Sequence, residues 1–270
     1  MGYSPHKYGV KAIYKAVRGP MTQKFLNLGE EIVCGDPALL LPLIYPVQRD
    51  GVSNGVLYLR HHWNIRPNSR FENAAMPGVD RIVNMEISES SWFDVLALIA
   101  NAKFILTGSL HGAVVAHAYG VPWAFCLPHG DVTNLPFKWY DWYAYLGLVF
   151  SRNDIVKNIE EGNRWWAENK SRMLYRSLTP LIKCFPYPVR NGRIKELVER
   201  AEHYDGVQRK KYGAQQSDLH HVVEQNFRNF KKESFFYFSN RAKLLYLLCP
   251  FPFLRKWVLN MASRIRKSKM

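Results

Sequence analysis

Acidic residues are scarce in this sequence, and none follows Glu233. The 270 residues include 37 Lys and Arg against 22 Asp and Glu, which gives a formal net charge of +15. Such an excess indicates an anionic partner: nucleic acid, anionic lipid, or a phosphorylated or acidic substrate. The chain has no RNA- or DNA-binding motif, and its aromatic residues do not alternate with Lys or Arg along any clear strand. We therefore expect no nucleic-acid partner.

Cysteine is also rare, and the four cysteines stand far apart at Cys34, Cys126, Cys184 and Cys249. They form neither a CxxC pair nor a zinc-type spacing, so we expect reduced thiols in a cytoplasm. Three histidines of possible interest, His61, His62 and His111, lack a local ligand signature. No metal is therefore expected.

Long apolar runs are missing as well. No stretch approaches about 20 uninterrupted apolar residues, so we expect no membrane-spanning helix. Residues 1–11 are polar and lack the apolar core of a signal peptide, which predicts a cytoplasmic protein. The hydrophobic fraction of 47% is nevertheless typical of a folded domain.

The most informative stretch is FILTGSLHGAVVAHAYGVPWAF, residues 104–125. It predicts a strand over 104–106, a small-residue turn over 107–109, a helix over 111–119 and a second strand over 121–125. Gly120 is typical of a residue that ends a helix. This order of elements is half of a parallel, doubly wound sheet.

His111 stands where the predicted turn ends and the helix begins, with Ser109 beside it. Free backbone N–H groups and the helix dipole at such a point favour a bound anion. A histidine in this place is a candidate for acid–base chemistry near neutral pH. His117, further along the helix, is expected to pack against neighbouring residues.

The rest of the chain continues the alternation of strands and helices. Strands are predicted over 31–34, 56–59 and 81–85, and helices over 21–28, 92–100, 138–148 and 190–205. Thr22 is a candidate N-cap of the first helix. The 92–100 helix is expected to place Phe93, Leu96, Ala97 and Ala100 on one face. The sequence therefore predicts an α/β fold whose parallel sheet is covered on both faces.

Three motifs occur in a fixed order: AVRGPMT at 16–22, GDPALLLP at 35–42 and TGSLHG at 107–112, the last followed by HAYGVP at 117–122. Together, in this order and with this approximate spacing, they resemble the polysaccharide pyruvyl transferase family over about residues 10–150. Many members have Arg-Leu-His where this chain has Ser109, Leu110 and His111. The Ser-Leu-His form resembles an exopolysaccharide ketal-pyruvate transferase branch.

The resemblance implies a GT-B-like fold, in which two Rossmann-like halves face a cleft. Most of the N-terminal half would precede the first motif, so this half is expected to be largely lacking. On that template, residues 1–46 are the remnant of the N-terminal half and residues 47–188 are the C-terminal Rossmann-like domain with its following helices. Residues 189–270 are a basic helical tail.

The resemblance also implies a function. Members transfer the enolpyruvyl unit of phosphoenolpyruvate to two hydroxyls of a sugar in a cell-surface polysaccharide or lipid-linked oligosaccharide, leaving a pyruvate ketal. Phosphoenolpyruvate is the donor substrate, and no cofactor is expected. Two alternatives stay open: a GT-B glycosyltransferase that uses a nucleotide sugar, and a truncated, non-catalytic binding protein.

The first group of site residues follows from the motifs and from the charges of the donor. His111 is the expected general acid or base, and Arg18 is a donor to the carboxylate or phosphate. Ser109, Leu110 and Gly112 flank His111 and are expected to line the substrate site.

Further candidates lie outside the best-matching motif. Arg60, His61 and His62 follow a predicted strand at the edge of the sheet where ligands bind, so they are expected to contact substrate. Lys138 and Asp141 are additional polar candidates for the cleft. Asp36 is expected to order the Gly-Asp-Pro turn through its side chain.

The tail, residues 235–270, combines short apolar blocks with basic residues and has no acidic ones. This composition predicts peripheral binding to an anionic membrane surface, which would place the protein at the inner face of the membrane. Helices packed on the protein's own surface are the alternative.

Overall fold

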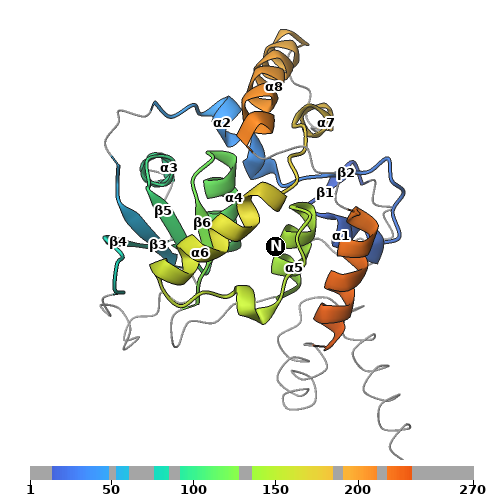
Figure 1. The fold of residues 1–270 in the computed structure, drawn as a ribbon. Helices are drawn as coiled ribbons and strands as arrows, with labels where there is room; N and C mark the ends of the chain where they lie inside the picture. Colours follow the sequence, from blue (N-terminus) through green and yellow to red (C-terminus); the bar gives the residue numbers. More distant parts are fainter. Residues whose placement is uncertain are drawn as a thin grey trace, which may run out of the picture. The chain divides into compact units, whose positions relative to one another are not determined.

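The computed structural model describes residues 14–48, 53–60, 76–84, 92–127, 136–184, 191–211 and 218–232. The chain divides into two units, Lys15–Asn226 and a second made of Met1–Tyr14 with Phe227–Met270. Every element labelled in Figure 1 belongs to the first unit. The division into 1–46, 47–188 and 189–270 stays a prediction.

The strands are β1 (Ala16–Val17), β2 (Val33–Cys34), β3 (Val56–Arg60), β4 (Arg81–Asn84), β5 (Phe104–Thr107) and β6 (Trp123–Phe125). The α-helices are α1 (Pro20–Phe25), α2 (Leu41–Ile44), α3 (Trp92–Ala100), α4 (Leu110–Ala118), α5 (Pro136–Tyr145), α6 (Ile159–Asn169), α7 (Thr179–Lys183) and α8 (Asn191–Lys211). Short 3₁₀ helices are η2 (Pro37–Leu40), η4 (Arg152–Asp154) and η5 (Lys170–Arg172). Residues 219–232 form a further helix.

The larger sheet has the strand order β4-β3-β5-β6, and every neighbouring pair is parallel (Figure 1). This arrangement confirms the predicted α/β class. The chain passes from β3 outward to β4 on one side and from β5 outward to β6 on the other, so β3 and β5 flank the point where the order reverses. Ligands of open parallel sheets bind beyond the carboxyl ends of such strands.

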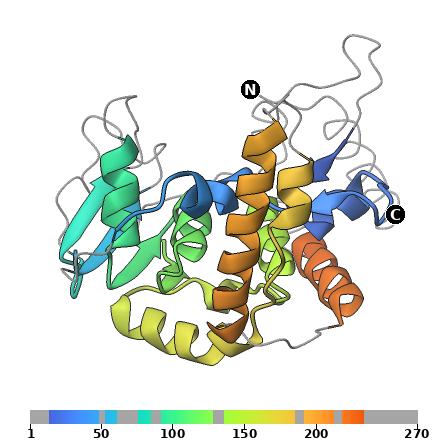
Figure 2. The same cartoon turned by 90° about the horizontal axis from the view of Figure 1, so that it is seen from above.

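Helices cover both faces of this sheet. A side chain at Gly112 of α4 would meet Thr107 Oγ1 at 2.6 Å, and one at Gly162 of α6 would meet Leu106 Cδ2 at 3.0 Å. Since successive strand residues point to opposite faces, α4 and α6 lie on opposite sides of β5. Helix α3 contacts α4, and Figure 2 shows α6 on the other side of the strands from α3.

A cluster of buried aromatic side chains joins β6, α5 and α6. The ring of Trp123 lies 5.3 Å from that of Trp165 and 6.4 Å from those of Trp142 and Trp166. Phe125 stacks on Trp139 at 3.8 Å. The cluster packs α5, which was predicted as a helix over 138–148, against β6 and α6.

A smaller sheet pairs β1 with β2 in parallel, and α1 follows β1 directly. Helix α1 has Gly19 as its N-cap, so the assignment of Thr22 to that position is wrong: Thr22 is the third helical residue. The prediction for α3 is wrong at Phe93, which is exposed, because the helix buries Val95, Leu96, Ile99 and Ala100. Gly120 ends α4 with a φ of 68°, as predicted.

None of the helices in the described parts of the chain is both long enough and apolar enough to cross a membrane.

Candidate functional site

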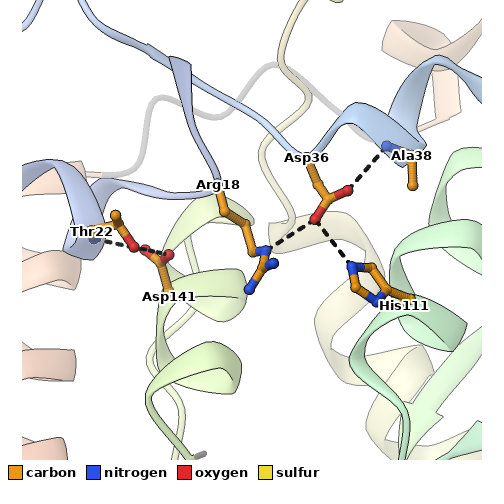
Figure 3. Close-up of polar contacts among 6 residues, drawn as sticks. All are labelled: Arg18, Thr22, Asp36, Ala38, His111 and Asp141. Carbon is orange, nitrogen blue, oxygen red and sulfur yellow. Dashed lines mark hydrogen bonds and ion pairs between the residues drawn. The ribbon is translucent and has the colours of Figure 1, made fainter. Parts of the chain in front are cut away.

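Asp36 lies at the centre of a polar group that joins the three sequence motifs (Figure 3). Its Oδ2 accepts a hydrogen bond from Arg18 Nε at 3.0 Å and lies 3.7 Å from His111 Nε2. Its Oδ1 accepts the Ala38 N–H at 3.0 Å. Asp36 itself is only 4% exposed, so this carboxylate is a fixed part of the fold.

Local structure explains why these residues meet. Arg18 follows β1 and Asp36 follows β2, and the two strands are parallel neighbours, so both residues emerge at the same edge. Asp36 then caps η2, which packs against α4 and thereby brings the carboxylate to the first turn of that helix, where His111 lies.

Arg18 is held in a way that leaves its terminal nitrogens available. Its hydrogen bond within the described residues runs from Nε to Asp36, and its side chain is 31% exposed. Figure 3 shows the two terminal nitrogens turned away from the Asp36 carboxylate. A guanidinium fixed through Nε can still offer both terminal N–H groups to a planar or tetrahedral anion.

His111 has a side chain that is 57% exposed, and its separation of 3.7 Å from Asp36 is too long for a hydrogen bond. Partial burial lowers the pKa of His111, Asp36 opposes this shift, and the positive charges of Arg18 and Lys138 reinforce it. The imidazole is therefore neutral at pH 7 and able to accept a proton.

Asp141 of α5 serves as a distant cap for α1. Its Oδ1 accepts the N–H groups of Met21 at 3.0 Å and Thr22 at 3.1 Å, and its Oδ2 accepts the Thr22 hydroxyl at 2.5 Å. A side chain at Gly19 would collide with the Asp141 carboxylate and main-chain carbonyl. The motif therefore needs glycine between Arg18 and the helix.

The charge of Arg18 affects the pKa values of two residues on α5. Burial raises the pKa of Asp141, while its hydrogen bonds from Thr22, the charge of Arg18 and the Met21 N–H oppose the shift. On the same helix, burial and the positive charge of Arg18 lower the pKa of Lys138. Helix α5 therefore carries an acidic residue, Asp141, and a basic residue, Lys138, near the Arg18 loop, which is defined here as residues 18–19 between β1 and α1.

The residues that flank His111 shape the turn between β5 and α4. Ser109 is the buried N-cap of α4, and its N–H donates to Thr107 Oγ1 at 2.9 Å. Leu110 is buried, and Gly112 lets the helix approach Thr107 closely. A role for Ser109, Leu110 and Gly112 in binding substrate stays a prediction.

Arg60 ends β3 and is buried. The preceding residue, Leu59, pairs with Thr107, so Arg60 lies at the same sheet edge as the turn before His111. The other two predicted residues at this edge, His61 and His62, lie outside the described residues. Binding of substrate by Arg60 stays a prediction.

Sequence reasoning understated Asp36. The predicted turn is confirmed by the bond from Ala38, but the carboxylate also contacts Arg18 and His111. Part of the signal was present, since Asp36 closely follows the strand predicted over 31–34, but no strand was predicted before Arg18. The expectation that His117 packs is confirmed, because it is buried and meets Trp142 edge-on at 5.5 Å.

Within the part of the chain that the structure describes, no three His, Cys, Asp or Glu side chains gather as a metal site would require.

The three residues that meet at the Asp36 carboxylate lie in a stretch that is similar to a known family. Residues 15–130, which contain Arg18, Asp36 and His111, match the family model of polysaccharide pyruvyl transferase. The chain is also 25% identical over 163 residues to the succinoglycan biosynthesis protein ExoV of Rhizobium meliloti strain 1021. That alignment covers 57% of this chain and 48% of the relative, so the chain spans about half the length of the curated relative it matches.

No solved structure matches the chain. The similarity to the family therefore depends on the sequence matches alone. Over residues 15–130, the chain is similar to the polysaccharide pyruvyl transferase family.

Proposed function

We propose that the site transfers pyruvyl from phosphoenolpyruvate to a sugar of an exopolysaccharide and forms a pyruvate ketal. The observation that carries the proposal is the contact of Arg18 and His111 with one buried carboxylate, that of Asp36. This arrangement places Arg18, which can donate hydrogen bonds to an anion, beside the neutral imidazole of His111. Phosphoenolpyruvate carries two anionic groups and reacts through proton transfer, so it needs both kinds of group.

The reaction assigns a task to each residue. Two sugar hydroxyl oxygens form bonds to C2 of the enolpyruvyl unit, the methylene carbon gains a proton to become a methyl group, and the C2–O bond to phosphate breaks. Of the two protons released by the hydroxyls, one is accounted for at the methyl group and the other leaves with phosphate. A neutral His111 removes a hydroxyl proton and can return it to carbon.

Arg18 contributes by binding rather than by proton transfer. Its terminal N–H groups hold a phosphate or carboxylate, and Asp36 fixes the guanidinium in place through Nε. Asp36 thereby acts as a positioning residue for Arg18, and its charge also favours the imidazolium form of His111 once a proton has been taken.

Mass spectrometry of an acceptor glycan incubated with phosphoenolpyruvate tests the proposal. The wild-type chain should add the mass of a pyruvate ketal, His111→Ala should abolish the addition, and His203→Ala should leave it unchanged because His203 is exposed on α8. Pyruvate addition by His111→Ala at the wild-type rate refutes the role of His111.

The alternatives predicted from the sequence give different outcomes in the same assay. Transfer from a nucleotide sugar, with none from phosphoenolpyruvate, would identify a glycosyltransferase. Glycan binding without either transfer would identify a binding protein. As part of this proposal, the protein has a GT-B-like fold, in which two Rossmann-like halves face a cleft.

We also propose that residues 235–270 hold the protein at the inner, anionic face of a membrane. These residues lie outside the described ones, so the support comes from their composition, in which apolar blocks alternate with Lys and Arg. Each basic residue near an anionic surface is worth about 1 kcal/mol. Co-sedimentation with anionic vesicles should weaken with salt and vanish when residues 235–270 are deleted, and equal pelleting of the shortened chain would refute the proposal.

A further inference from the structure

Lys138 shares a helix with the residue that anchors the Arg18 loop. It lies three residues before Asp141 on α5, and side chains at this spacing occupy the same face of a helix. The carboxylate of Asp141 in turn touches the start of α1, next to Gly19 and therefore next to Arg18. Lys138 and Arg18 thus belong to two segments that meet at Asp141.

The charges of three basic groups also act on one another. The positive charge of Arg18 lowers the pKa of Lys138, and the charges of Arg18 and Lys138 both lower the pKa of His111. This influence agrees with the place of Lys138 on the face of α5 that carries Asp141, which contacts the start of α1.

The carboxylates of Asp36 and Asp141 already accept hydrogen bonds from other groups. Asp36 accepts hydrogen bonds from Arg18 and Ala38, and Asp141 accepts three from the first turn of α1. Lys138 is half-buried and has neither a hydrogen bond nor an ion pair among the described residues. Holding a partly desolvated ammonium without a counter-ion costs free energy, and an anionic ligand would recover that cost.

We propose that Lys138 is a second anion-binding residue of this site, which holds one anionic group of a phosphorylated carboxylic acid while the terminal nitrogens of Arg18 hold the other. The inference rests on the proposed function, since it names the residue that completes the binding of a donor with two anionic groups. A compact ammonium on a flexible stem and a planar guanidinium suit two groups of different shape.

Isothermal titration calorimetry with two probes tests this division. Phosphoglycolate carries both a phosphate and a carboxylate and is not consumed, whereas inorganic phosphate offers a single group. Lys138→Met keeps the length of the side chain and removes the charge. Lys103→Met makes the same change at an exposed lysine just before β5, at the opposite edge of the sheet.

Lys138→Met and Arg18→Met should each weaken phosphoglycolate binding by about 10-fold or more, the loss expected for one hydrogen bond to a charged group. Lys103→Met should bind like the wild type. Inorganic phosphate should lose affinity in only one of the two site variants. Lys138→Arg keeps the charge and should bind phosphoglycolate within a few-fold of the wild type, which guards against an effect of misfolding.

Two outcomes overturn the inference: wild-type binding of phosphoglycolate by Lys138→Met, or an equal loss of inorganic phosphate binding in both site variants. Failure of the proposed function is distinguishable from these. If the wild type binds phosphoglycolate in the expected pattern but never transfers pyruvyl from phosphoenolpyruvate, the role of Lys138 stands and the reaction assignment falls.

Discussion

Asp141 binds Thr22 through both oxygens of its carboxylate, across 119 residues of sequence. One oxygen accepts the N–H of Thr22 and the other accepts its hydroxyl, while Met21 donates a further bond. The N-cap of α1 is Gly19, which has no side chain to cap the helix. Asp141 therefore supplies from α5 the cap that the local sequence lacks, and it fixes the loop that carries Arg18.

Replacing Asp141 with alanine should destabilise the fold. Three donors at the start of α1 would lose their acceptor, and loss of a cap together with buried unsatisfied donors costs about 1–3 kcal/mol. Denaturant unfolding measures the change. Glu202→Ala, on the exposed side of α8, is the control and should fall within about 0.5 kcal/mol of the wild type. An unfolding free energy for Asp141→Ala equal to that of the control would show that the cap contributes nothing.

The contribution of Asp141 should also depend on pH. Its folded pKa is raised by burial, so the folded state holds its proton at a higher pH than the unfolded state. The stability from this group is therefore full below the unfolded pKa of about 3.9 and is lost as pH rises through the folded pKa. Compared with Asp141→Asn, which does not titrate, the wild type should gain relative stability as pH is lowered from 7 toward 4. A difference that is independent of pH would contradict this.

His111 should report the charges around it in an NMR titration. Because Asp36 raises the pKa of His111 while Arg18 lowers it, Asp36→Asn should move the titration to lower pH and Arg18→Met should move it to higher pH. In the wild type the midpoint should lie below the ordinary value of about 6.5. Shifts of the same sign in the two variants would mean that the imidazole does not sit between these groups.

Two glycines give a matched pair for testing helix packing. Gly112→Ala should destabilise by about 1–3 kcal/mol, since the added methyl would meet Thr107 Oγ1 at 2.6 Å and Leu59 Cδ1 at 3.0 Å. Gly206→Ala on α8 meets nothing within 4 Å and should stabilise by about 0.5–1 kcal/mol through helix propensity. Thermal unfolding of both variants decides the matter, and a tolerated alanine at position 112 would show that α4 can move away from the sheet.

Hydrogen exchange should separate the two sheets. The pair β1 and β2 has only two residues in each strand, and isolated two-stranded sheets are marginally stable. Amides of Val17 and Cys34 should therefore exchange much faster than those of Ile105 and Leu106 in the centre of the larger sheet. Equal protection would mean that contacts such as the Asp141 cap stabilise the small sheet fully.

The sequence predicted those elements in which local and long-range preferences agree. The β5–α4–β6 unit shows strand, glycine turn, helix and capping glycine in order, so its type and its approximate bounds were predictable. The predicted buried face of α3 was wrong at Phe93, because a helical period shows which residues share a face but not which face meets the sheet. The alternative face, with Val95 and Ile99, fits the period equally well.

The site was predictable in part for a related reason. Arg18 and His111 stood out because each belongs to one of the three motifs, and His111 also follows a predicted turn. The link through Asp36 and the cap by Asp141 depend on contacts between residues far apart in sequence, and no local pattern records them. Lys138 was a candidate for the cleft from the sequence, but its relation to Arg18 becomes visible only once α5 is placed beside the start of α1.

The aromatic cluster around Trp123 gives the protein a built-in optical reporter. With Trp142, Trp165 and Trp166 all within 6.4 Å between ring centroids, excitation of one indole passes readily to its neighbours. Near-ultraviolet circular dichroism from such fixed, asymmetric packing disappears when a chain keeps its helices but loses its tertiary order. Because the cluster joins β6, α5 and α6, this signal follows the helix that carries Lys138 and Asp141, and it does so without any introduced label.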